Sequence, residues 1–105
     1  MTGIESKPTP QSEPELSIEE YTALLRELAK QFPVPTWEEV KPDWQWVHGR
    51  MEDATLDPDG KWSDRHIAVY QNQVVGHDTN PLRLRLMKAR ELGIHPERLV
   101  ITYLF

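Results

Sequence analysis

Two short β-prone runs separated by three turn-forming residues constrain the fold of this chain more than any other feature. The runs are His66–Tyr70 and Val74–His77, and Gln71-Asn72-Gln73 lies between them. Asn72 tolerates the left-handed backbone conformation that a tight turn needs, so the pattern predicts a β-hairpin. An isolated hairpin is only marginally stable in water, and further elements must therefore cover it.

A helix and a third strand are predicted after the hairpin. Asn80 and Pro81 suit the N-cap and the first position of a helix, and Gly93 can end it. The run Leu99–Phe105 is almost entirely apolar and has the length of a strand. A right-handed crossover through the helix would lay this last strand parallel to the second strand of the hairpin in the same sheet.

The first helix is predicted over residues 17–31. Ser17 and Glu20 have the spacing of a capping box, in which each side chain accepts a hydrogen bond from the other residue's backbone. Apolar residues then recur at helical spacing until Pro33, namely Ile18, Tyr21, Leu24, Leu25, Leu28 and Phe32. A helix this short is stable only when packed, so we expect it to lie on the rest of the domain or on a partner.

The segment from 36 to 56 is rich in tryptophan. Thr36 and Glu39 form a second capping box, but Pro42 limits that helix to about one turn, unless a new short helix begins at the proline. Three tryptophans follow within ten residues, namely Trp37, Trp44 and Trp46. Their large apolar area must be covered, so we expect them to complete the core. A turn is predicted over Asp57–Gly60.

Residues 1–15 are predicted to form a disordered tail, because they contain three prolines and a single large apolar side chain, Ile4. The alternative is a short linear motif that becomes ordered on a partner. We expect residues 16–105 to form one small α+β domain. Its centre is a ββαβ unit over about residues 60–105 with a three-stranded sheet, on which the N-terminal amphipathic helix and the Trp-rich segment pack.

The 105-residue chain has a net charge of −5 at pH 7, and the charge is uneven. Residues 1–52 contain five Lys or Arg and ten Asp or Glu, whereas residues 53–105 contain seven of each. This balance counts against non-specific nucleic-acid binding, which depends on neutralising phosphates. The absence of cysteine excludes disulfides and fits a cytoplasmic protein. No apolar run has the length of a signal-peptide core or a membrane span, so we expect neither secretion nor membrane insertion.

The C-terminal half has a characteristic order of residues and elements, which begins with Gly60 and Trp62 before the hairpin. Its other parts are the strands Ile67–Val69 and Val74–His77, the helix Asn80–Leu92 and the strand Leu99–Ile101. Over about residues 60–104 this pattern resembles a short bacterial and archaeal domain of unknown function. The chain departs from it where residues 63–66 separate the tryptophan from the strand, and where Asp78 follows the histidine in place of glycine. The resemblance implies a ββαβ fold and no particular activity.

Catalytic and metal sites have weak support. His77 and Asp78 follow a predicted strand, where a carboxylate could orient an imidazole for acid–base chemistry. The simpler interpretation is that His77 closes the hairpin with a backbone hydrogen bond. The four histidines form no zinc-binding pair, the acidic residues near Gly60 do not fit a calcium loop, and no nucleophile motif occurs. We therefore expect that the protein binds no metal and no cofactor and is not an enzyme. A small hydrolase is the weakest alternative.

The helix after Asn80 is a candidate binding surface. It has four cations within eight residues, namely Arg83, Arg85, Lys88 and Arg90. Helical geometry directs Leu84 and Met87 away from the side that faces the sheet, which consists of Leu82, Leu86 and Ala89. If both are exposed, Leu84 and Met87 form an apolar patch beside Arg83 and Arg90. Such a patch would bind a protein or, as the less favoured alternative, a nucleic acid. The alternative is that the acidic N-terminal helix covers this face.

The last strand is the second candidate. The hairpin occupies two adjacent positions of a three-stranded sheet, so a last strand that lies outside the hairpin is an edge. It has no Lys, no Pro and no bulge that would block pairing with another chain. We expect Val100, Tyr103 and Phe105 to contact a protein partner or a second copy, and we expect the protein not to be a free monomer.

These features favour a non-enzymatic protein-interaction module, such as an accessory or regulatory subunit of a larger bacterial complex in the cytoplasm. The alternative is a small antitoxin-like regulator that binds nucleic acid through the basic C-terminal helix.

Overall fold

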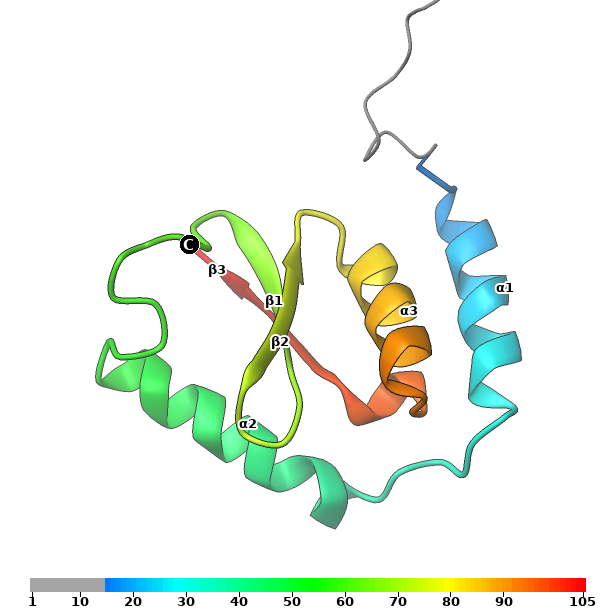
Figure 1. Ribbon diagram of the computed structural model, residues 1–105, viewed down its shortest axis with the longest axis horizontal. Helices are drawn as coiled ribbons and strands as arrows, with labels where there is room; N and C mark the ends of the chain where they lie inside the picture. The colour runs from blue at the N-terminus through cyan, green and yellow to red at the C-terminus, as the bar shows by residue number, and fades with distance from the viewer. Residues whose placement is uncertain (1–14) are drawn as a thin grey trace, which may run out of the picture.

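The structure is a computed structural model that describes residues 15–105 (Figure 1). Its elements are α1 (Ile18–Ala29), α2 (Trp37–Glu52), β1 (Arg65–Val69), β2 (Val74–Asp78), α3 (Pro81–Leu92), a short 3₁₀ helix η2 (Pro96–Arg98) and β3 (Val100–Leu104). The predicted α+β class and the predicted order of helices and strands are confirmed. The predicted tail, residues 1–15, lies outside the described residues except for Glu15.

The three strands form one antiparallel sheet in the order β2-β1-β3. β1 pairs with β3 over its whole length, from Arg65 opposite Leu104 to Val69 opposite Val100. Because both neighbours run antiparallel to β1, β3 runs in the same direction as β2, as the predicted crossover requires. The two strands are not adjacent, however, since β3 lies on the far side of β1. β3 is therefore an edge strand.

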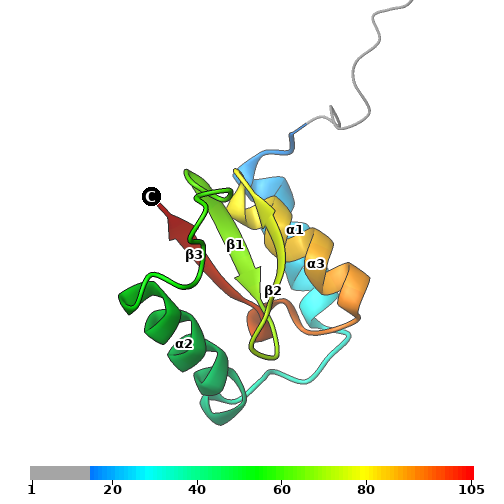
Figure 2. The same ribbon diagram turned by 60° about the vertical axis from the view of Figure 1, so that its left-hand side comes forward.

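Helices cover both faces of the sheet (Figure 2). α3 packs on one face and α1 packs on α3, whereas α2 lies against the opposite face. The core on the α3 side consists of Tyr21, Leu28, Ala68, Leu84, Leu86, Ala89 and Leu99. The core under α2 consists of Val47, Ile67, Val69, Val100 and Leu104. Successive residues of β1 point to opposite faces, so this central strand contributes to both cores.

α2 is one continuous helix, and the expected break at Pro42 is wrong. Thr36 and Glu39 form the predicted capping box, in which the Glu39 amide donates to the Thr36 hydroxyl at 3.3 Å. A proline inside a helix removes a backbone hydrogen bond and costs about 3 kcal/mol. Burial of the apolar face of the helix offsets that cost, because Val47 is fully buried against the sheet.

The tryptophans of α2 only partly meet the expectation that they complete the core. Trp44 and Trp46 are half-buried and pack against the core under α2. Trp37, at the first position of the helix, is 58% exposed and does not contribute to the core.

A buried carboxylate fixes α2 to the rest of the domain. Asp43, which is 2% exposed, accepts hydrogen bonds from the backbone amides of Gln71 at 3.2 Å and Asn72 at 2.8 Å. Its third contact is an ion pair with Arg98 of η2 at 2.8 Å. Gln71 and Asn72 have positive φ angles of 54° and 61°, as expected for the tight turn of the hairpin. Asp43 therefore joins α2, the hairpin turn and η2.

α1 and α3 begin at the predicted N-caps, Ser17 and Asn80, and α3 ends at Gly93 with a φ of 67°. Ile18 lies in the first turn of α1 and is exposed, so the predicted apolar stripe does not extend to it. Across residues 15–105, no helix combines the length and the apolar character needed to cross a membrane.

Candidate interaction surface

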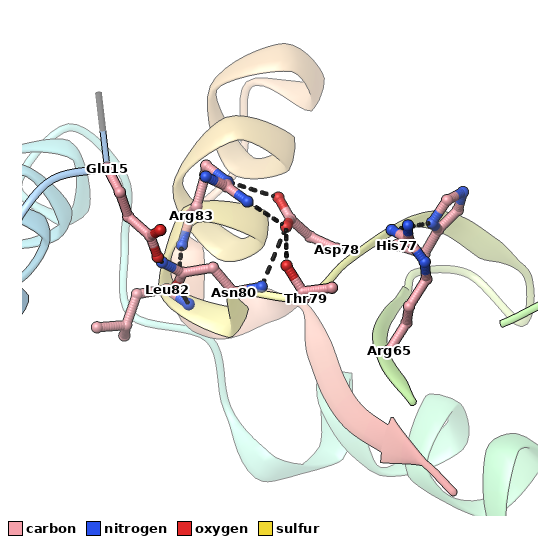
Figure 3. Close-up of polar contacts among 8 residues, drawn as sticks. All are labelled: Glu15, Arg65, His77, Asp78, Thr79, Asn80, Leu82 and Arg83. Carbon is pink, nitrogen blue, oxygen red and sulfur yellow. Dashed lines mark hydrogen bonds and ion pairs between the residues drawn. The ribbon is translucent and has the colours of Figure 1, made fainter. Parts of the chain in front are cut away.

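The first predicted binding cation, Arg83, is engaged within the chain. It donates from Nε and Nη2 to the carboxylate of Asp78 at 2.8 and 2.6 Å (Figure 3). These hydrogen bonds hold the pKa of Asp78 below its ordinary value and raise the pKa of Arg83. Asp78 also accepts from the amide of Asn80 at 3.0 Å. The pair ties the end of β2 to α3, which argues against the predicted role of Arg83 as a free binding residue.

Two of the other three cations of α3 are engaged as well. Arg85 donates from Nη1 to the carbonyl oxygens of Pro96 and Leu99 at 2.7 and 3.1 Å, and its burial lowers its pKa. Lys88 pairs with Glu91 at 3.0 Å. Arg90 is exposed. α3 therefore presents less free positive charge than its sequence indicates.

The apolar patch predicted on α3 is half covered. Leu84 is buried, because α1 packs over it with Tyr21 and Leu28. The predicted contact of Leu84 with a partner is therefore wrong, and at Leu84 the alternative holds, in which the N-terminal helix covers this face. Met87 is exposed, as predicted.

The carboxylate of Asp78 and the ring of His77 contact different partners. The carboxylate oxygens of Asp78 bind Arg83 and Asn80, whereas Nδ1 of His77 lies 3.4 Å from Nη1 of Arg65. Figure 3 shows the His77 ring on the side of Arg65, away from the carboxylate. Nor do His, Asp and Glu side chains gather anywhere in residues 15–105 in a group that could hold a metal ion. These contacts do not support the less favoured alternative, in which Asp78 orients the His77 imidazole for acid–base chemistry.

β3 has an open side. In the described part of the chain, the outer edge of β3 pairs with no other strand, and Val100–Leu104 contains no charged residue. Val100 is 1% exposed, so its side chain cannot contact a partner as predicted. Tyr103 is 38% exposed and Phe105 is 93% exposed, as their predicted roles require.

The aromatic side chains at the end of β3 form a small cluster. The ring of Tyr103 lies 5.0 Å from the ring of His66 and 5.4 Å from that of Phe105, between centroids. Its hydroxyl donates to Asp64 at 3.1 Å, and this hydrogen bond raises the pKa of Tyr103. The side chain is thus held in place while more than a third of it stays exposed.

The opposite edge of the sheet, β2, is protected against the addition of another strand, whereas β3 is not. Between Gly76 and Val74, β2 contains one residue more than β1, a β-bulge that interrupts regular pairing. The side chain of Lys88 lies over Gly76, and β2 ends with the polar pair His77 and Asp78. Bulges and charged side chains are the usual means by which proteins block strand addition. β3 has neither.

α2 runs beside β3 in the same direction and extends the apolar surface. A groove of about 340 Å³ joins Trp37 and Trp44 to Leu99, just before β3, and a second of about 310 Å³ joins Met51 to Leu104 and Phe105 at its end. Trp37 and Met51 are both exposed. These two residues were not predicted as binding residues. Trp37, Trp44 and Met51 recur every seven residues, a signal that the expected break at Pro42 concealed.

Comparison of the chain with protein-family models, curated proteins and solved structures gives no match in any of the three. The resemblance of residues 60–104 to a bacterial and archaeal domain of unknown function therefore stays a prediction.

Proposed function

We propose that this protein is a non-enzymatic protein-interaction module, an accessory or regulatory subunit of a larger bacterial complex in the cytoplasm. The observation that carries the proposal is the open, uncharged edge of β3, with the exposed aromatic rings of Tyr103 and Phe105 beside it. An unblocked edge strand presents a row of unpaired backbone groups to which another strand can add.

The cations of α3 give less support to a nucleic-acid-binding regulator. Arg83, Arg85 and Lys88 each have a partner within the chain, and the net charge of −5 opposes approach to phosphates. The proposed binding surface is therefore the β3 edge and not α3.

The test compares tagged wild-type protein with two variants as bait in native lysate. Tyr103→Lys places a charge on the β3 edge, and the new ammonium can pair with Asp64. Met87→Lys is the matched control, because Met87 is exposed on α3, away from this edge. We expect wild type and Met87→Lys to retain a polypeptide in stoichiometric amount, either another chain or an untagged copy, and Tyr103→Lys to retain at least about tenfold less.

Equal retention by all three baits, or retention by none, would contradict the proposal. The far-UV circular dichroism and the unfolding midpoint of each variant show whether it is folded.

A further inference from the structure

We propose that the chain which binds the β3 edge is a second copy of this protein, added antiparallel about a two-fold axis through Thr102. This inference rests on the proposed function, because it names the occupant of the same surface. It would join the two sheets into one of six strands, in the order β2-β1-β3-β3-β1-β2. A two-fold contact of this kind is closed, so association stops at the dimer.

Charge is the first argument for a second copy. Two identical chains that each carry a net charge of −5 repel at long range, so contact between them is least opposed where the surface contains no acidic side chain. The five residues of β3 contain no charged side chain, so two copies of the strand bring no like charges opposite each other.

The sequence of β3 is also complementary to itself. A two-fold axis through Thr102 places Thr102 opposite Thr102 of the second copy, Ile101 opposite Tyr103, and Val100 opposite Leu104. Threonine pairs and pairs of an aromatic with a β-branched residue are favourable across antiparallel strands. The faces match too, because Val100 and Leu104 both belong to the core under α2.

The two ends of α2 carry opposite charges, so the α2 helices of two copies are complementary when they run antiparallel. The helix begins with the acidic residues Glu38 and Glu39 beside the exposed Trp37, and it ends with Arg50 beside the exposed Met51. Since α2 runs along β3, the two-fold axis brings the start of one helix to the same end of the joined sheet as the end of the other. Opposite charges and exposed apolar side chains then lie near each other from the two copies.

Cysteine cross-linking tests the register, because the native chain contains no cysteine. In the proposed dimer, Thr102→Cys places two thiols directly opposite each other, with Cβ atoms roughly 5 Å apart, close to the separation a disulfide spans. Gln73→Cys is the control, because Gln73 is exposed in the hairpin turn, away from β3. Under a mild oxidant, we expect Thr102→Cys to form a covalent dimer at least about tenfold faster than Gln73→Cys.

A second pair of variants tests the same register if Thr102→Cys is poorly folded. Ile101→Cys mixed with Tyr103→Cys should form the mixed disulfide in preference to either homodimer, since these positions face each other across the axis. Equal rates for Thr102→Cys and Gln73→Cys, or no preference in the mixture, overturn the inference.

If the purified chain is a monomer while lysate retention still depends on Tyr103, only this inference fails. If that dependence is also absent, the proposed function fails with it.

Discussion

At the scale of single residues, Asp43 determines how α2 lies on the sheet. A buried carboxylate is costly unless its oxygens are paired, and here two backbone amides and Arg98 pair them. This contact holds the start of α2 at the end of the sheet where β3 begins. No local pattern marks Asp43 in the sequence, because its partners lie 28 to 55 residues away. Such long-range pairs are what sequence periodicity cannot reveal.

Asp78 is the residue whose protonation we expect to affect stability. Its pKa is lowered in the folded protein, mainly by the hydrogen bonds from Arg83, so the unfolded chain binds more protons when the carboxyl titrates. The stabilisation is therefore complete above the ordinary pKa of 3.8 and is lost as the pH falls through the lower folded value.

Asp78→Asn should lower the free energy of unfolding by about 1–2 kcal/mol at pH 7, since it removes a charge-assisted pair that is partly screened by solvent. Urea unfolding at pH 7 and at about pH 3 measures the effect, and the difference between wild type and variant should shrink at the lower pH. Asp59→Asn, in an exposed turn, is the control and should change stability by less than about 0.5 kcal/mol. An undiminished difference at low pH would show that the carboxylate charge is not responsible.

At the scale of elements, local signals predicted most of the fold. Both capping boxes, the hairpin turn, the Asn80 N-cap and the Gly93 end are determined by residues within a few positions of each other, and all are present. The misjudged element was α2, because the local cost of Pro42 is outweighed by burial against a sheet that lies far away in the sequence. Leu84 shows the same limit. Helical geometry predicts which side of α3 Leu84 lies on, but it does not reveal that α1 covers that side.

Two glycines should respond to alanine in opposite ways. Gly49 lies inside α2 with nothing within 4 Å of an added Cβ, so Gly49→Ala should stabilise the protein by about 0.5–1 kcal/mol. Gly93 ends α3 with a φ of 67°, so Gly93→Ala should destabilise it by about 1–2 kcal/mol. Urea unfolding of both variants at pH 7 measures the changes. Shifts of the same sign would contradict the assignment of these helix boundaries.

At the scale of the whole molecule, helices of the described part of the chain cover both faces of the sheet and leave its two edges uncovered. Because the hairpin occupies adjacent positions, the sequence predicts that the last strand is an edge if it lies outside the hairpin, and the structure places it there. The sequence could not show which residues of the run Leu99–Phe105 are exposed, since an apolar run has no alternation that distinguishes its faces. Tyr103 and Phe105 are accordingly exposed as predicted, whereas Val100 is buried. For that reason a charge at Val100 would disrupt the core and cannot serve as a test of the edge.

Sedimentation equilibrium of the purified protein tests the central claim, that β3 is an open edge which a second copy occupies. At roughly 100 μM, wild type and Met87→Lys should sediment with twice the chain mass of 12.3 kDa. Tyr103→Lys should sediment as a single chain, because a charge on the edge opposes strand pairing. A wild type that keeps the mass of one chain at every concentration, or a Tyr103→Lys dimer as stable as the wild type, would contradict the account.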